Sequence, residues 1–240
     1  MSLQSRLVEY GDCETTFEGM LAWDDTRKAP KPGVLVCHTI RGRTTFEEGK
    51  AKELARLGYV AMAADVYGAS ELGCADTAAR SNMDALLADR ALLQRRLSLS
   101  LETMARQPEV DAAKTAAIGF CFGGLCALDL ARIGAPLLGV VSFHGLFGAP
   151  GNTSGNKTSA SILVLHGWDD PMATPDAVVA LGKELTALEA DWQIHGYGRT
   201  MHAFTNPAAS DRQRGTLYDA AADRRSWVAM KNFLEEKLIQ

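Results

Sequence analysis

The chain has 240 residues, and 25 lysines and arginines against 29 aspartates and glutamates give it a formal net charge of −4. Hydrophobic residues make up 47% and charged residues 22%, which is typical of a globular protein and excludes disordered and collagen-like chains. Basic residues do not gather in blocks, so no nucleic-acid partner is expected. The length suits one domain, which we predict to span residues 1–240.

No segment approaches the roughly 18 consecutive apolar residues that a membrane span needs. The first ten residues lack the basic and then apolar layout of a signal peptide, so we expect a cytoplasmic protein without a membrane partner. An odd number of cysteines without a C-x-x-C pair predicts reduced thiols rather than disulfides or a zinc site. The five are Cys13, Cys37, Cys74, Cys121 and Cys126.

The first half of the chain alternates strand and helix signals. Polar-apolar alternation between Leu7 and Trp23 predicts a hairpin or edge strands around a turn at Gly11 and Asp12. Apolar runs at 34–37 and 59–64 predict buried strands, and the segment between them predicts a helix that Thr44 or Thr45 caps. One long helix is expected next, because Leu86, Leu93, Leu97, Leu101 and Met104 recur at helical spacing before Pro108.

The second half continues the alternation. Four more strands are predicted at 116–119, 139–143, 162–166 and 192–197, with helices after the first, after the third and at 217–238. Such repetition predicts an α/β fold, in which one mostly parallel sheet is covered by helices on both faces.

The sharpest motif lies where a predicted strand meets a predicted helix, at Gly119-Phe120-Cys121-Phe122-Gly123-Gly124. In the nucleophile elbow of α/β-hydrolases the reactive side chain stands on a strained strand-to-helix turn, and glycines flank it because a Cβ would collide with nearby backbone. Cys121 occupies the nucleophile position. A buried cysteine beside a glycine-rich turn is the alternative.

A nucleophile of this kind needs an acid and a base, which follow it in that chain order. Asp169 and Asp170 end the strand at 162–166, where sheets of this type place functional groups, and Asp170 is the preferred acid. His202 follows the last predicted strand and is the preferred base. Each partner alone has a structural alternative, a helix-capping turn for the aspartates and an ordinary hydrogen-bonded histidine for His202.

The chain resembles the dienelactone hydrolase family of α/β-hydrolases over nearly its whole length. The resemblance rests on the elbow, Gly-Trp-Asp-Asp-Pro at 167–171, Met-His-Ala-Phe at 201–204 and Val-Leu-Val-Cys-His-Thr-Ile-Arg-Gly at 34–42. It implies a Cys-His-Asp triad that hydrolyses an ester or lactone without a cofactor or metal. Cys121 would be the nucleophile, His202 the base and Asp170 the acid, three residues after Gly167.

The remaining site residues complete this expectation. The backbone N–H groups of Phe122 and Ile40 are expected to bind the oxyanion, and His38, Thr39, Trp168 and Asn206 to contact a small ester or lactone substrate. Two of these depart from the family pattern: Thr39 stands where the family has a glutamate, and Asn206 where it has an arginine that grips a substrate carboxylate. The sequence does not define the oligomeric state.

Two other functions stay open at this stage. The fold could serve as a catalytically idle ligand-binding protein, or Cys121 could be a redox sensor, for which Cys126 is the nearest resolving cysteine. His144, His166 and Cys126 are interpreted as packing residues. No ligand spacing supports metal binding by His166, Asp169 and Asp170.

Overall fold

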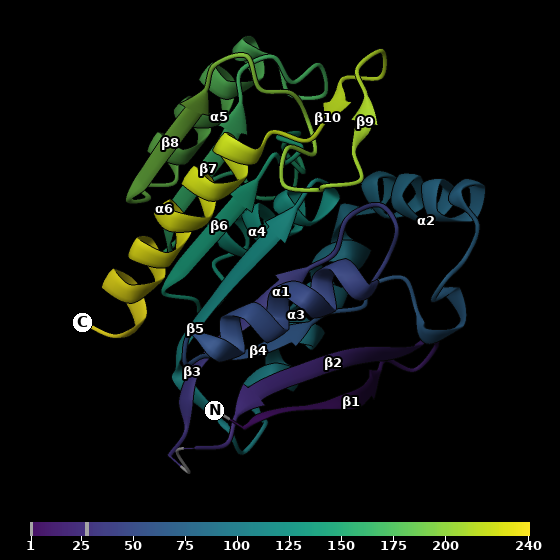
Figure 1. Ribbon diagram of the computed structural model, residues 1–240, viewed down its shortest axis with the longest axis vertical. Coiled ribbons are helices and arrows are strands. Elements are labelled where there is room, and N and C mark those ends of the chain that lie inside the picture. Colours follow the sequence, from purple (N-terminus) through teal and green to yellow (C-terminus); the bar gives the residue numbers. More distant parts are fainter. Residues whose placement is uncertain (1, 27–28) are drawn as a thin grey trace. The chain divides into compact units, whose positions relative to one another are not determined.

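The computed structural model describes residues 2–26 and 29–240, which form an α/β protein (Figure 1). Its eight longer strands are hydrogen-bonded in the order β1-β2-β4-β3-β5-β6-β7-β8. In this sheet the pairs β3–β4, β6–β7 and β7–β8 are parallel, and the β1–β2 and β2–β4 pairs at the N-terminal end of the order are antiparallel. The predicted fold class, a mostly parallel sheet with helices, is confirmed.

Two compact units make up the chain, Met1–Ile118 and Gly119–Gln240, and the boundary falls inside one strand. Whether they act as one domain, as the length predicts, stays a prediction. The first unit contains β1 Leu3–Gly11, β2 Thr16–Asp24, β3 Lys31–Cys37, α1 Thr45–Arg56, β4 Val60–Ala63, a short 3-10 helix at Ala69–Glu71, α2 Asp76–Ala88, α3 Arg90–Ala105 and most of β5 Val110–Phe120.

In the first unit the predicted hairpin is present, and α1 packs against β2, β3 and β4 while α3 packs against β1 and β3. Thr44, not Thr45, caps α1. The prediction of one long helix is wrong, because the chain breaks at Asp89 into α2 and α3. The Asp89 side chain accepts a hydrogen bond from the Leu92 N–H, so it starts a new helix inside a segment whose apolar spacing looks continuous.

The second unit carries the end of β5 and then α4 Phe122–Arg132, β6 Gly139–Phe143, β7 Ser161–Gly167, α5 Pro175–Ala187, β8 Trp192–Tyr197, β9 Ser210–Asp211, β10 Thr216–Leu217 and α6 Ala220–Leu238. The predicted strands and helices of this half are all found. The small β9–β10 hairpin was not predicted, because two-residue strands leave no periodicity to read.

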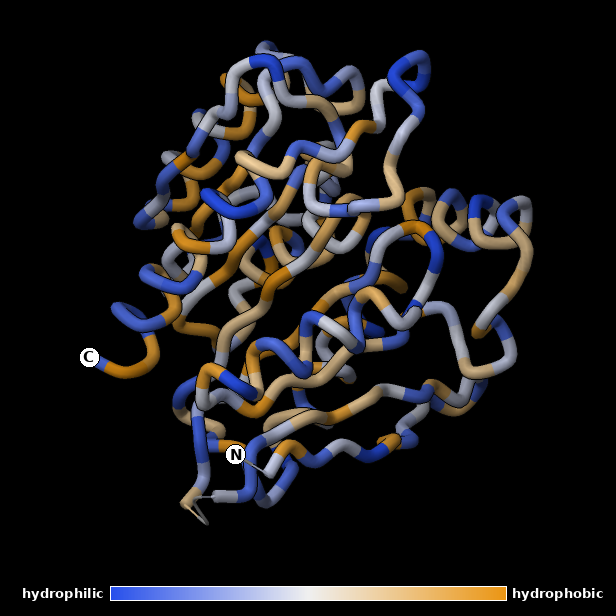
Figure 2. Tube along the Cα trace, in the orientation of Figure 1, coloured by the Kyte–Doolittle hydropathy of each residue, from blue (hydrophilic) through white to orange (hydrophobic). Residues whose placement is uncertain are grey.

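The core of the second unit lies between its strands and helices. Every residue of β6 and β7 is buried, as expected for parallel strands covered on both faces. Helix α6 packs on β6 and β7, and Figure 2 shows its hydrophobic and hydrophilic residues alternating along the helix. Burial of these apolar faces is the main source of stability for such an arrangement, at about 25 cal/mol for each Å² removed from water.

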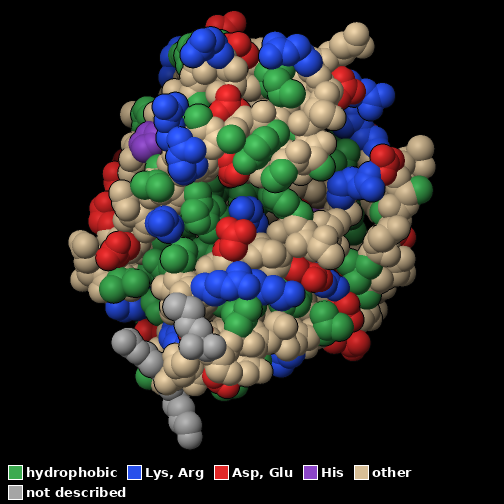
Figure 3. Space-filling model, viewed as in Figure 1, with side chains coloured by type: hydrophobic (Ala, Val, Ile, Leu, Met, Phe, Trp, Pro, Cys, Tyr) green, Lys and Arg blue, Asp and Glu red, His purple; other side chains and the backbone are tan. Residues whose placement is uncertain are grey.

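No helix among the described residues is long and apolar enough to cross a membrane. Figure 3 shows lysines and arginines interspersed with aspartates and glutamates on the face in view.

Candidate active site

The elbow of the second unit has the strained geometry that the glycine spacing predicts. Cys121 has a φ of 59°, in the left-handed region that residues with a side chain rarely adopt, and it directly precedes α4. A Cβ on Gly119 would lie 1.9 Å from the carbonyl oxygen of Gly123, so only glycine allows this turn to close. The Cys121 N–H donates to the Phe143 carbonyl at the end of β6 (3.0 Å), which ties the elbow to its neighbouring strand.

Cys121 is partly exposed at the N-terminal end of α4, whereas Cys126, one turn further along the helix, is fully buried. A helix N-terminus carries a partial positive charge and orients backbone N–H groups outward, which favours a thiolate over a thiol. The Phe122 N–H belongs to this first helical turn.

The two predicted partners meet within the same unit. Asp170 follows β7 and is 1% exposed, and its Oδ2 lies 2.7 Å from Nδ1 of His202, which is 2% exposed. The other carboxylate oxygen, Oδ1, accepts from the Met172 N–H at 2.8 Å. Asp169 is exposed and does not make this contact; its N–H donates to Thr200 O. The carboxylate that orients the histidine ring is therefore that of Asp170.

Cys121 acts on the same histidine. Burial disfavours the charged form of His202, but the charge of Cys121, the hydrogen bond to Asp170 and the charge of Asp170 outweigh burial and raise the pKa of His202 to about 10. Since Asp170 engages Nδ1, the nitrogen left for the thiol is Nε2. A cysteine and a histidine whose charges interact this strongly titrate as a pair.

Two more histidines lie near His202. His144 follows β6, and its ring centroid is 5.1 Å from that of His202. His166 lies in β7, fully buried, and packs 5.3 Å from the ring of Phe147. Burial is the largest factor that lowers the pKa of both, and the charge on His202 lowers each further, whereas the charge of Asp170 offsets part of the shift for His166. Both rings are neutral at pH 7.

The remaining predicted site residues of this unit have local contacts of their own. Trp168 is 46% exposed, two residues before Asp170. A Cβ on Gly196 would lie 3.3 Å from its ring, which therefore packs along β8. Asn206 is partly exposed, and its Oδ1 accepts from the Ala208 N–H at 3.0 Å, which closes a turn after the His202 loop.

The first unit holds the other predicted residues, His38, Thr39 and Ile40, in the loop after β3. His38 is buried, its Nδ1 lies 2.6 Å from Thr39 O, and its Nε2 accepts from the Val66 N–H at 3.3 Å. The Tyr67 hydroxyl donates to Ile40 O at 3.1 Å. The ring of His38 thus has a backbone partner at each nitrogen and joins this loop to the one after β4.

A buried carboxylate near the start of α1 holds the same loop. Glu47 is fully buried; its Oε1 accepts from the Thr39 N–H (3.0 Å) and its Oε2 from the N–H (2.9 Å) and hydroxyl (2.7 Å) of Thr44. The spacing of Thr44 and Glu47 is that of a capping box, a signal present in the sequence.

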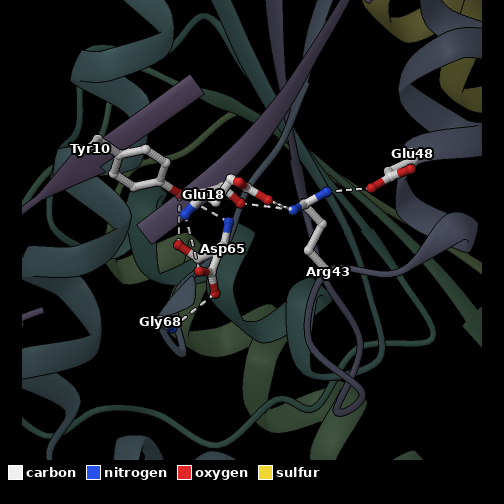
Figure 4. A network of polar contacts seen from close by, with 6 residues as sticks. All are labelled: Tyr10, Glu18, Arg43, Glu48, Asp65 and Gly68. Atoms are coloured by element: carbon white, nitrogen blue, oxygen red, sulfur yellow. Dashed lines mark hydrogen bonds and ion pairs between the residues drawn. The ribbon is translucent and has the colours of Figure 1, made fainter. Parts of the chain in front are cut away.

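Figure 4 shows a second polar network of the first unit, around Arg43 and Asp65. Arg43 pairs with Glu18 at 2.6 Å and with Glu48, and Asp65 accepts from the N–H groups of Glu18, Tyr67 and Gly68. The Tyr10 hydroxyl donates to Asp65 O at 2.6 Å. These contacts attach the β1–β2 hairpin to the loops after β3 and β4.

Comparisons with known proteins identify the family of the chain. The model of the dienelactone hydrolase family matches residues 17–238. A solved structure named m3DLH is 38% identical, with a TM-score of 0.91 over 99% of this chain and 100% of that one. A dienelactone hydrolase-like promiscuous phosphotriesterase from metagenomic libraries is also 38% identical, with a TM-score of 0.90 over 99% of both chains.

A curated relative extends the likeness to an animal. An uncharacterized protein of Caenorhabditis elegans is 39% identical over 147 residues, which cover 60% of this chain and 93% of that protein. Since the family model spans all but the two ends of the chain, the chain belongs to the dienelactone hydrolase family and is an ester or lactone hydrolase.

Proposed function

We propose that the chain cleaves its ester or lactone through a covalent thioester on Cys121, with His202 as the proton carrier and Asp170 as the group that orients it. The observation that carries the proposal is the 2.7 Å contact between Asp170 Oδ2 and His202 Nδ1, on a ring that also interacts with Cys121. A buried carboxylate on one nitrogen fixes the tautomer and turns the other nitrogen toward the nucleophile.

At rest, the pair is a Cys121 thiolate beside a protonated His202, because the pKa of His202 is raised to about 10. The thiolate attacks the carbonyl carbon and forms a carbon–sulfur bond, and the carbonyl electrons move onto oxygen. When this oxyanion collapses, the bond to the leaving oxygen breaks and that oxygen takes the proton from His202 Nε2. An alcohol leaves, or in a lactone the freed hydroxyl stays attached, and a thioester with a neutral His202 remains.

The oxyanion of this step needs hydrogen-bond donors. We propose the Phe122 N–H as one of them, because it lies in the first turn of the helix that follows Cys121. The second proposed donor is the Ile40 N–H, in the loop that Glu47 and His38 hold. Such donors are commonly worth about 3 kcal/mol each in the transition state.

Hydrolysis of the thioester reverses the proton transfer. Acylation removes the charge on Cys121, which is a main factor that raises the pKa of His202, so the pKa of the neutral ring falls and it can act as a base. Water attacks the thioester while His202 Nε2 takes its proton, and the thiolate leaves. The acid product is released, and the starting ion pair is restored.

For the substrate, we propose a small, uncharged or weakly anionic ester or lactone. Asn206 stands where the family's arginine grips a carboxylate, and its side-chain oxygen is engaged by the Ala208 N–H. Trp168 offers an exposed aromatic surface next to Asp170, and His38 and Thr39 stay proposed contacts. Likeness to a promiscuous phosphotriesterase adds a neutral phosphotriester to the compounds worth testing. No further partner is proposed, and the cytoplasmic location stays a prediction from the sequence.

The two alternative hypotheses, a ligand-binding protein and a redox sensor, have less support. A binding module has no need for an aspartate–histidine–cysteine arrangement with a raised histidine pKa. A redox sensor pairs its reactive cysteine with a resolving one, but Cys126 is fully buried within α4.

Turnover of a fluorogenic acetate ester separates the three readings. We expect wild type to hydrolyse it and Cys121→Ala to lose at least about a thousandfold in kcat/KM, as removal of a triad nucleophile does. Cys13→Ala, which removes an exposed cysteine, is the matched control and should leave turnover unchanged. A mass increase equal to the acyl group on Cys121 during rapid quench would identify the thioester. Full activity in Cys121→Ala would overturn the proposal.

A further inference from the structure

His144 lies where the three segments that carry the triad come together. Its own N–H donates to Leu165 O in β7, the strand that leads to Asp170, at 2.8 Å. The residue before it, Phe143, accepts the N–H of Cys121. The backbone around His144 therefore contacts both the elbow and the strand of the acid.

The ring of His144 contacts the third segment, the loop of His202. Its centroid is 5.1 Å from the His202 ring at an interplanar angle of 66°, and 5.0 Å from the Phe204 ring at 81°. Its Nε2 lies 2.8 Å from the hydroxyl oxygen of Thr205. Three of the four residues 202–205 therefore pack on the His144 side chain or hydrogen-bond to it.

The His144 ring is suited to be a fixed, neutral neighbour of His202. Burial first, and then the charge on His202, hold the pKa of His144 well below its usual value. Its Nδ1 has no hydrogen-bond partner among the described residues. A buried N–H without an acceptor destabilises the folded state more than an unprotonated ring nitrogen does. The single proton of the neutral ring is therefore on Nε2, which donates it to the Thr205 hydroxyl.

The backbone of His144 is strained as well. Its φ of 36° lies in the left-handed region, which is unfavourable for a residue with a side chain. Such a conformation persists only where the surroundings require it. Here it lets the N–H reach β7 while the ring reaches the His202 loop.

We propose that His144 is a positioning residue, which holds the His202 ring between Asp170 and Cys121 through its edge-to-face contact and its hydrogen bond to Thr205. The inference rests on the proposed function for its catalytic meaning. His202 is then surrounded by Asp170, Cys121, His144 and His166, of which the two neighbouring histidines are neutral. The positive charge is confined to the one ring that carries the proton in catalysis.

The test compares two substitutions that break the same hydrogen bond. His144→Phe keeps an aromatic ring, and Thr205→Val keeps the shape of Thr205 without its hydroxyl. We expect each to lower kcat/KM about tenfold, and the double variant to lose no more than either single one, because the two side chains act as a unit. Thr205→Ser, which retains the hydroxyl, should keep most of the kcat/KM that Thr205→Val loses. His195→Phe, in β8 and outside the cluster, is the matched control.

A second readout does not depend on turnover. Nitrogen-15 and proton NMR of the His202 ring, assigned with His202→Gln, follows the Nδ1–H that bonds Asp170. In His144→Phe and Thr205→Val we expect this proton to exchange at least about tenfold faster and the titration midpoint of His202 to fall, since a loosened ring loses part of the ion pair that raises its pKa. A side chain that only fills space would lower the melting temperature and leave both quantities unchanged.

The outcomes separate the two proposals. If Cys121→Ala retains activity while the His202 resonance changes as described, the proposed function fails and the role of His144 stands. If the resonance, its titration and kcat/KM in Thr205→Val all match wild type, the positioning role is overturned, whatever the catalytic result and even if His144→Phe fails to fold.

Discussion

His38 and His202 are both buried histidines that follow strands, yet the two units use them differently. The nitrogens of His38 contact the Thr39 carbonyl and the Val66 N–H, which are backbone groups that do not titrate. One nitrogen of His202 contacts the Asp170 carboxylate, and the charge of Cys121 acts on the same ring. Burial of a polar side chain therefore does not mark function by itself. What marks it is whether the partners can exchange a proton.

The carboxylates repeat the contrast. Both oxygens of Glu47 accept hydrogen bonds from Thr39 and Thr44, so this side chain stabilises a loop. One oxygen of Asp170 accepts a hydrogen bond from the Met172 N–H, and the other contacts Nδ1 of His202. Substitution of Glu47 should therefore mainly change stability, and substitution of Asp170 should mainly change catalysis.

The largest expected effect is on catalysis, in Asp170→Asn. An amide keeps the shape of the carboxylate but leaves His202 without the acceptor that fixes its tautomer, so we expect kcat/KM to fall about a thousandfold or more. Steady-state kinetics on the fluorogenic ester measures it. Asp169→Asn, at the exposed neighbour, should stay within about twofold of wild type. The assignment would be wrong if the two variants exchanged behaviour.

Next in size is a loss of stability in the first unit. Glu47→Ala leaves two backbone N–H groups and a hydroxyl near Thr39 and Thr44 without their acceptor, which should lower the free energy of unfolding by about 2–4 kcal/mol. Urea denaturation measures the change. Glu53→Ala, on the exposed side of the same helix, is expected to lose less than about 0.5 kcal/mol. Equal losses in both would show that Glu47 contributes no more than a surface residue.

Neutral buried histidines make the second unit sensitive to acid. The pKa of His144 is lowered in the folded chain, so below pH 6.5 the unfolded chain binds a proton that the folded one does not, and stability falls as the pH decreases. The slope approaches about 1.4 kcal/mol per pH unit for this residue. His202 behaves oppositely: its raised pKa contributes stability that is fully present below about 6.5 and is lost as the pH rises toward about 10.

Urea denaturation between pH 5 and 7 tests this difference. Wild type should lose more stability than His144→Phe over that range, because phenylalanine cannot take up the proton. Parallel losses in the two proteins would mean that His144 is not neutral in the folded state.

How much of the site could be predicted from the sequence depends on how far apart along the chain its contacting residues lie. The elbow, Asp170 and His202 lie in short local motifs, each at the end of a strand whose apolar run is visible in the sequence. The capping box of Glu47 is local too, and spacing alone could have found it. The contacts of His144 with Leu165, His202 and Thr205 join segments far apart in the chain, so no pattern around residue 144 indicates them.

The fold shows the same limit. The alternating strands and helices could be predicted because their hydrophobic periodicities differ. The break between α2 and α3 could not. A single hydrogen bond of the Asp89 side chain to the Leu92 N–H decides it, inside a pattern that fits one continuous helix.

The smallest expected effect concerns substrate charge. With Asn206 closing its own turn, a neutral ester should have a kcat/KM equal to or up to about tenfold above that of a matched carboxylated lactone or ester. Asn206→Arg should shift this ratio toward the anionic compound. A strong preference of wild type for the carboxylated compound would show that another basic residue binds the carboxylate.

The pH dependence of Cys121 alkylation by iodoacetamide tests the central claim most directly, because it reports the thiolate whether or not the substrate is known. The account predicts that the rate is already high below pH 7 and that its low-pH limb disappears in His202→Gln, which removes the cation paired with Cys121. A rate that rises only with an apparent pKa near about 8.5, the value of an ordinary thiol, and that His202→Gln leaves unchanged, would contradict it.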